Sequence, residues 1–102
     1  MGFGGDFFDM AKLLNRLTDV KIKKLGAGLH PDGDGLYLQV HGPTARSWIY
    51  RYWRLEKVTY FGLGPYPAVT LEDARRARDK WKRVRQAGDD PKAVRSIVRI
   101  VS

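Results

Sequence analysis

The chain has 102 residues, which is the size of one small domain with a modest core. Its 19 Lys and Arg against 11 Asp and Glu give a formal net charge of +8, which on so small a chain favours a polyanionic partner, most often nucleic acid. The absence of cysteine excludes disulfides and thiolate metal sites, so the cytoplasm is the expected compartment. We find no transmembrane stretch and no signal peptide, and expect no membrane partner.

Composition divides the chain into three parts. Residues 1–16, with early glycines followed by an apolar patch, are expected to form a flexible leader. Residues 17–88 hold the segments with clear hydrophobic periodicity and are expected to fold as one domain. The sequence Asp89-Asp90-Pro91 marks a boundary, so residues 89–102 are predicted to be a linker or a truncated tail.

The domain begins with a predicted short helix. Thr18 and Asp19 offer N-cap chemistry for a helix that runs to about Lys24. Two helical turns are not stable alone, so this helix must dock onto the rest of the domain. Residues 26–35 (GAGLHPDGDG) follow and are predicted to be a loop, because glycine and proline dominate them.

The hydrophobic period then changes to two, which indicates strands. Three strands are predicted, over residues 36–40, 46–54 and 57–63, and Leu55-Glu56 is the two-residue turn between the second and the third.

Antiparallel pairing around that turn places residue 52 opposite 59, 50 opposite 61 and 48 opposite 63. The resulting core face comprises Leu36, Leu38, Val40, Trp48, Tyr50, Tyr52, Thr59, Phe61 and Leu63. The resulting outer face comprises Tyr37, Gln39, His41, Ile49, Arg51, Trp53, Val58 and Tyr60.

A long helix is predicted from Leu71 to about Ala87. Thr70 and Asp73 form a capping box at its start, and Gly88 ends it. Apolar residues at three- and four-residue spacing give it one apolar stripe, which we expect to cover the core face of the sheet. The predicted fold is therefore α+β: a three-stranded antiparallel sheet packed on one long C-terminal helix, with a short N-terminal helix.

The outer face of the predicted sheet is the strongest candidate site. A ribbon of two or three strands fits the DNA major groove, where Arg51 and Gln39 can read guanine and adenine edges. The candidate DNA-binding residues are Tyr37, Gln39, His41, Arg46, Arg51, Trp53, Arg54, Lys57 and Tyr60. Two alternatives remain: an ordinary solvated sheet face, or a protein contact through Ile49, Trp53 and Val58, which are costly to expose without a partner.

Other chemistries find little support in the sequence. The segment Asp32-Gly-Asp-Gly35 lacks the glycine that a calcium loop requires, and His30 and His41 do not have the spacing of metal ligands. No nucleophile, base and orienting group occur together. We therefore expect no catalytic residue, no cofactor and no metal.

Four blocks of sequence resemble a known family. The blocks are residues 17–23 (LTDVKIK), 34–38 (DGLYL), 47–52 (SWIYRY) and 61–71 (FGLGPYPAVTL). Together they resemble the arm-type DNA-binding domain at the N-terminus of tyrosine recombinase integrases from prophages and genomic islands. The resemblance implies a three-stranded sheet packed on a C-terminal helix, with the sheet in the major groove of arm-type attachment sites that flank the recombination core.

Carried over by position, the resemblance makes Arg51 a match to a basic strand residue of the family. Trp53 and Val58-Thr59-Tyr60 stand where relatives usually carry Arg or Lys, and Leu55-Glu56 replaces a turn that usually contains Gly. The family's catalytic Arg, His-x-x-Arg and Tyr lie in a separate C-terminal domain, and no His-x-x-Arg occurs in this chain. The resemblance thus implies a non-catalytic domain or fragment of an integrase that binds double-stranded DNA sequence-specifically.

Overall fold

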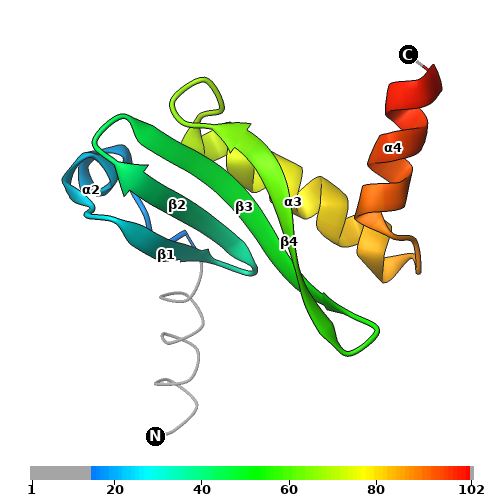
Figure 1. The fold of residues 1–102 in the computed structure, drawn as a ribbon. Coiled ribbons are helices and arrows are strands. Elements are labelled where there is room, and N and C mark those ends of the chain that lie inside the picture. Colours follow the sequence, from blue (N-terminus) through cyan, green and yellow to red (C-terminus); the bar gives the residue numbers. More distant parts are fainter. Residues whose placement is uncertain (1–14, 102) are drawn as a thin grey trace, which may run out of the picture.

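The computed structural model describes the backbone of residues 15–101 and the side chains of residues 15–97, so most of the predicted leader lies outside the described residues. In Figure 1 the strands lie side by side, and one long helix crosses behind the sheet. The elements in chain order are α2 (Asp19–Lys24), β1 (Gly28–Gly33), β2 (Leu36–Gly42), β3 (Ala45–Arg54), β4 (Lys57–Pro65), α3 (Leu71–Gln86) and α4 (Pro91–Val101).

The sheet has four antiparallel strands in the order β1-β2-β3-β4. The α+β class is confirmed, but the prediction of three strands and of a loop over residues 26–35 is wrong, because Gly28–Gly33 pairs with β2. The glycines of this segment serve the turn into β2, where Gly33 and Gly35 have φ of 115° and 88°. Pro31 is tolerated because β1 is an edge strand, where one side needs no hydrogen-bond donor.

The predicted register of β3 and β4 is confirmed near their turn. Tyr52 pairs with Thr59 and Tyr50 pairs with Phe61. Trp48 pairs with Gly64 and not with residue 63, because the register shifts between positions 48 and 49. A bulge of this kind adds one residue to one strand, which a sequence pattern does not reveal.

The turn between β3 and β4 has the predicted two residues. Leu55 and Glu56 have φ of 50° and 63°, and a two-residue turn of type I′ requires positive φ at both central positions. Neither residue is Gly or Asn, so the pairing of the flanking strands imposes the turn.

The core lies between the sheet and α3. Trp48, Tyr50 and Phe61 of the sheet are at most 1% exposed, and Trp81 of α3 packs against Phe61 with ring centroids 5.0 Å apart. The Trp48 indole Nε1 donates a hydrogen bond to the Val69 carbonyl oxygen over 2.8 Å, so this buried polar group is satisfied. The predicted core face is therefore the one that α3 covers.

The predicted helix boundaries are confirmed. The Thr18 hydroxyl accepts a hydrogen bond from the Lys21 amide at the start of α2. At the start of α3, Thr70 and Asp73 form the capping box, each side chain accepting from the other residue's amide. Gly88, with φ of 92°, follows the end of α3.

A second C-terminal helix, α4, corrects the prediction of one long helix. It occupies most of the segment predicted to be a linker or tail, and its Val94 packs against the core cluster around Trp81. Arg95 stacks on the Phe61 ring at 3.7 Å, and its Nη1 donates to the Gly62 carbonyl oxygen over 2.5 Å. This contact covers part of the exposed edge of β4.

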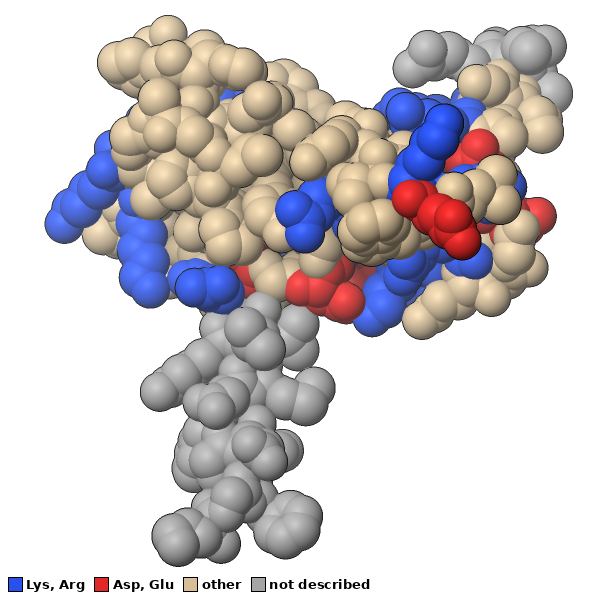
Figure 2. Space-filling model, turned by 60° about the horizontal axis from the view of Figure 1, so that its bottom comes forward, with Lys and Arg blue, Asp and Glu red and all other residues tan. Residues whose placement is uncertain are grey.

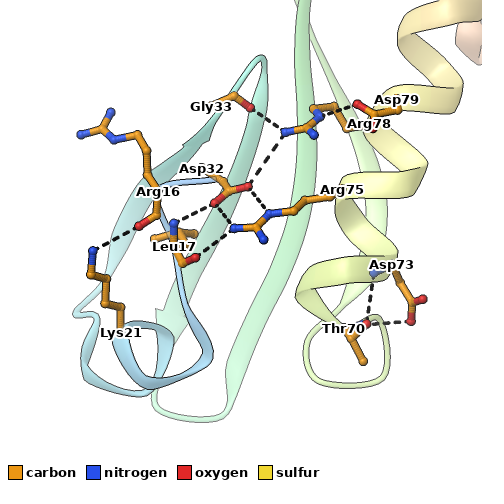
Figure 3. Close-up of polar contacts among 10 residues, drawn as sticks. All are labelled: Arg16, Leu17, Lys21, Asp32, Gly33, Thr70, Asp73, Arg75, Arg78 and Asp79. Carbon is orange, nitrogen blue, oxygen red and sulfur yellow. Dashed lines mark hydrogen bonds and ion pairs between the residues drawn. The ribbon is translucent and has the colours of Figure 1, made fainter. Parts of the chain in front are cut away.

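The buried carboxylate of Asp32 ties three parts of the fold together (Figure 3). Its Oδ1 accepts hydrogen bonds from the Leu17 amide at 2.7 Å and from Arg75 Nη2 at 2.9 Å, and its Oδ2 accepts from Arg75 Nε at 2.8 Å. Arg78 Nη1 lies 3.9 Å from Oδ2 and donates to the Gly33 carbonyl oxygen. Hydrogen bonding to Asp32 raises the pKa of Arg75 above its ordinary value.

We predict that Asp32→Asn destabilises the domain strongly. The amide keeps the size of the carboxylate but leaves Arg75 and Arg78 without their buried counter-charge, which costs about 3 kcal/mol, the lower end of the range for buried pairs because the Arg75 side chain is 25% exposed. Urea unfolding measures the loss. Asp34→Asn is the matched control, because the Asp34–Lys82 pair is about one-third exposed on each side and contributes less than about 1 kcal/mol. Equal losses in the two variants would contradict the role given to Asp32.

Candidate nucleic-acid interface

The face of the sheet opposite α3 is the candidate interface, and no helix of the described chain covers it (Figure 1). Directly paired residues on neighbouring strands point to the same face, so the strand pairings define its members. These are Leu29, Pro31, Tyr37, Gln39, Ser47, Ile49, Arg51, Trp53, Val58, Tyr60, Gly62 and Pro65, which we call the outer face. None of these residues is acidic, and Arg51 is the one Lys or Arg among them.

Arg51 lies in the middle of the outer face, on β3. Its amide donates a hydrogen bond to the Gly35 carbonyl oxygen over 2.7 Å, which fixes the backbone. Its guanidinium carbon lies 5.0 Å from the centroid of the Tyr37 ring, in a cation–π contact. Stacking uses the flat face of a guanidinium, whereas reading guanine uses its edge. Tyr37 can therefore orient Arg51 and leave its hydrogen-bonding edge for a ligand.

Large apolar side chains surround Arg51 on the hairpin of β3 and β4, which extends beyond the end of β2 (Figure 1). Trp53 is 61% exposed, Tyr60 is 50% exposed and Val58 is 36% exposed. Trp53 pairs with Val58, and Arg51 pairs with Tyr60. The hairpin thus presents a patch of aromatic and aliphatic side chains with a single cation at its inner end.

The structure brings five of the nine predicted site residues together. Tyr37, Gln39, Arg51, Trp53 and Tyr60 all lie on the outer face. His41 lies at the register shift between Val40 and Gly42, where it has no paired residue on β3. Arg46, Arg54 and Lys57 occupy the alternate strand positions, whose side chains take the opposite side of the sheet. They are near the outer face in sequence only, so any contact they make with DNA lies outside the face itself.

Arg54 takes part in a contact between the hairpin of β3 and β4 and the start of α4. Its Nε lies 3.8 Å from Asp90 Oδ2, and the Tyr52 hydroxyl donates to Asp90 Oδ1 over 3.3 Å. The same Oδ1 accepts from the Lys92 amide, so Asp90 caps α4 while it contacts the hairpin. Asp90 was not among the predicted residues, although an Asp followed by Pro91 is a common helix start and gave a usable signal.

Burial raises the pKa of the Tyr52 hydroxyl above its ordinary value of 10.0, and the neighbouring carboxylate of Asp90 raises it further. The hydroxyl therefore stays protonated at neutral pH and keeps donating to Asp90. Because the folded-state pKa is raised, this contribution to stability is present below pH 10.0 and is lost as the pH rises through the raised value.

Charge is distributed unevenly over the molecule. In Figure 2 Lys and Arg side chains lie at the lower left and on the right, with one group between them, and acidic residues lie at the lower centre and among the cations on the right. The upper left part of this view is largely tan. Several cations of α3 are matched locally, as in the Arg76–Glu72 pair at 2.6 Å. In the described part of the chain no cluster of His, Cys, Asp or Glu is arranged to hold a metal ion. None of its helices is long and apolar enough to span a membrane.

Comparison with known proteins decides the family. The model of the arm DNA-binding domain family matches residues 17–97, which include the whole sheet and α3. The chain belongs to this family. The match begins where the predicted domain begins and continues past residue 88 into α4.

Three integrases are similar to this arm DNA-binding domain. The integrase of Enterobacteria phage P4 is 39% identical over 70 residues, covering 67% of this chain. The prophage integrase IntA of Escherichia coli K12 is 36% identical over 88 residues, covering 80% of this chain, and the prophage integrase IntZ of the same strain is 33% identical over 57 residues, covering 56% of this chain. The matched regions are 16%, 21% and 14% of these proteins, so the chain corresponds to a small part of each.

The arm DNA-binding domain has tryptophans on both sides of its sheet, which makes a paired test of the two faces possible. Trp48→Ala removes a side chain that is 0% exposed and is expected to cost about 3–5 kcal/mol. Trp53→Ala removes an exposed side chain and is expected to change the stability by less than about 1 kcal/mol. Thermal melts of the two variants measure the difference. A larger loss for Trp53→Ala would show that the faces are exchanged.

Proposed function

We propose that this arm DNA-binding domain binds double-stranded DNA by placing the outer face of its sheet in the major groove. Family membership supports DNA binding in site-specific recombination. The observation that carries the mode of binding is the open, carboxylate-free sheet face with Arg51 stacked on Tyr37 at its centre. Arg is the residue that most often reads guanine, through its O6 and N7.

The dimensions of the sheet favour this mode. Neighbouring strands are about 4.8 Å apart, so β2, β3 and β4 together span about 10 Å, which suits a major groove about 12 Å wide. From Gln39, which lies beside Ser47, to Trp53 the face extends along seven residues of β3, or roughly 20 Å. At 3.4 Å per base pair this length covers about six base pairs. β1 then lies at the rim of the groove.

Each of the nine predicted site residues has a chemical role in this proposal. Arg51 and Gln39 read base edges, Tyr37 orients Arg51, and Trp53 contacts apolar parts of bases such as the thymine methyl group. Tyr60 and His41 supply further hydrogen bonds, whereas Arg46, Arg54 and Lys57 reach phosphates outside the face. The DNA is proposed to be the arm-type sites that flank the recombination core.

We further propose that the domain recognises DNA and takes no part in strand cleavage. The chain matches a small part of each integrase, and that part is covered by a family described as DNA-binding. The residues that the structure brings together on the outer face comprise no nucleophile held by a base and an orienting group. Cleavage then belongs to a different domain of the recombinase.

A protein contact through Ile49, Trp53 and Val58 is the second candidate function. The observation in its favour is the exposure of Trp53 directly beside Val58, which leaves an apolar patch on the hairpin. The two candidates differ in their dependence on salt, because phosphate contacts release counterions and apolar contacts do not.

Titration with duplex DNA at several salt concentrations tests the proposal. Neutralisation of about four to six phosphates predicts that log K falls with log [salt] with a slope of about −4 to −5, with micromolar affinity or weaker at physiological salt. Arg51→Ala should weaken binding by about 1–3 kcal/mol and relax the preference at one base pair, with an unchanged melting temperature.

The matched control is Arg83→Ala, which removes the same charge from an exposed position of α3 on the other side of the sheet. It should weaken binding much less than Arg51→Ala. A slope near zero would rule out DNA binding through this face and favour the protein contact. Equal effects of the two arginine variants would show that Arg51 contributes charge only.

A further inference from the structure

A second cationic feature lies at the end of the sheet away from the hairpin tip. Here the C-terminal end of α2 and the turn from β2 to β3 enclose a pocket, which is lined on its polar side by Lys23 and Arg46 and includes Gly26, Gly42 and Pro43. Its remaining lining residues are apolar, and none of them is acidic. The two cations come from different elements, so the fold and not the local sequence brings them together.

Arg46 differs from the other enclosed arginines of the domain. Arg75 and Arg78 are held by Asp32, whereas Arg46 forms no ion pair with any acidic residue that the structure describes. Its Nε is buried and lacks a hydrogen-bond partner among the described residues. A buried donor without an acceptor costs about 1–3 kcal/mol, more when it is charged, so the described residues leave part of the hydrogen-bonding capacity of Arg46 unused. Arg46 can therefore donate hydrogen bonds to an anion that enters the pocket.

The wall of the pocket allows a bulky anion to come close. A Cβ placed on Gly26 or on Gly42 meets no atom within 4 Å, so both glycines border open space. The Gly26 carbonyl oxygen already lies 2.7 Å from His30 Nε2, which lowers its repulsion of an anion. The pocket thus combines two cations with free approach, which is the chemistry that a phosphate requires.

We infer that this pocket holds one backbone phosphate of the duplex, gripped by Arg46 and Lys23. The inference rests on the proposed function, because it places the phosphate beside the groove that the outer face enters. Arg46 precedes Ser47, which pairs with Gln39 at one end of the outer face. Lys57 lies at the opposite end of β3 and β4, next to the hairpin turn. A phosphate held here fixes the position of the sheet along the groove and carries no sequence preference of its own.

The test compares Arg46→Ala and Lys23→Ala with Arg83→Ala, using one duplex with the preferred sequence and one with the same bases scrambled. Each pocket variant should bind both duplexes about threefold to tenfold more weakly at about 0.1 M salt, with a salt slope shallower by about 1. Arg46→Lys keeps the charge and should keep the slope. Thermal melts accompany each titration, and the melting temperature of Arg46→Ala should not fall, because the variant loses an unsatisfied donor.

The outcomes separate this inference from the proposed function. If the unmodified chain shows the steep slope but Arg46→Ala behaves like Arg83→Ala, the phosphate site is refuted and DNA binding stands. If Arg46→Ala weakens only the preferred duplex, Arg46 reads bases and the inference is wrong. If the unmodified chain does not bind DNA, the proposed function fails and the inference with it.

A second experiment titrates the domain with inorganic phosphate alone and monitors the NMR signals of Lys23, Arg46 and their neighbours. We expect no saturable shifts below about 10 mM, because a single phosphate gains only these two charge-assisted contacts. Saturation at micromolar phosphate would instead identify a site for a free phosphate compound and would overturn the assignment to the DNA backbone.

Discussion

The contact on which the domain most depends is the buried carboxylate of Asp32. It joins the segment before α2, through the Leu17 amide, to α3, through Arg75, and it sits on the edge strand β1. A buried ion pair stabilises only when its geometry is good and its remaining hydrogen bonds are satisfied, and both oxygens of Asp32 meet that condition. By holding α3 against one face of the sheet, this contact leaves the other face uncovered.

The sequence predicts those parts of the fold that local chemistry specifies. Helix starts at Thr18 and Thr70 are visible because their caps involve residues three apart, and strand alternation separates the two faces of the sheet. The strand β1 was not predicted because glycine and proline are rare in strands and its sequence contains both. Its conformation depends on pairing with β2, which the local sequence does not reveal. The bulge beside Trp48 and the packing of α4 likewise depend on partners that are distant in sequence.

The candidate site is predicted only in part, for the same reason. Alternation finds Arg51 and its neighbours on the outer face, but closeness in sequence adds Arg54 and Lys57, whose side chains take the opposite side. The pocket at Arg46 joins β3 to the end of α2 and has no local signature. Asp32 stands in a segment in which the sequence predicts a loop and no metal site, and its partner Arg75 is 43 residues away.

In the proposed complex the open face of the sheet meets DNA while the covered face remains core. The chain has three tryptophans, and their indole N–H signals in an NMR titration with duplex DNA show which face binds. Trp53 is exposed on the outer face, whereas Trp48 donates to the Val69 carbonyl oxygen inside the core and Trp81 packs on Phe61. The Trp53 signal should shift strongly as DNA is added, with little change in the other two. A shift of the Trp81 signal alone, with the Trp53 signal unmoved, would place the DNA on the helical side of the sheet and contradict binding through the outer face.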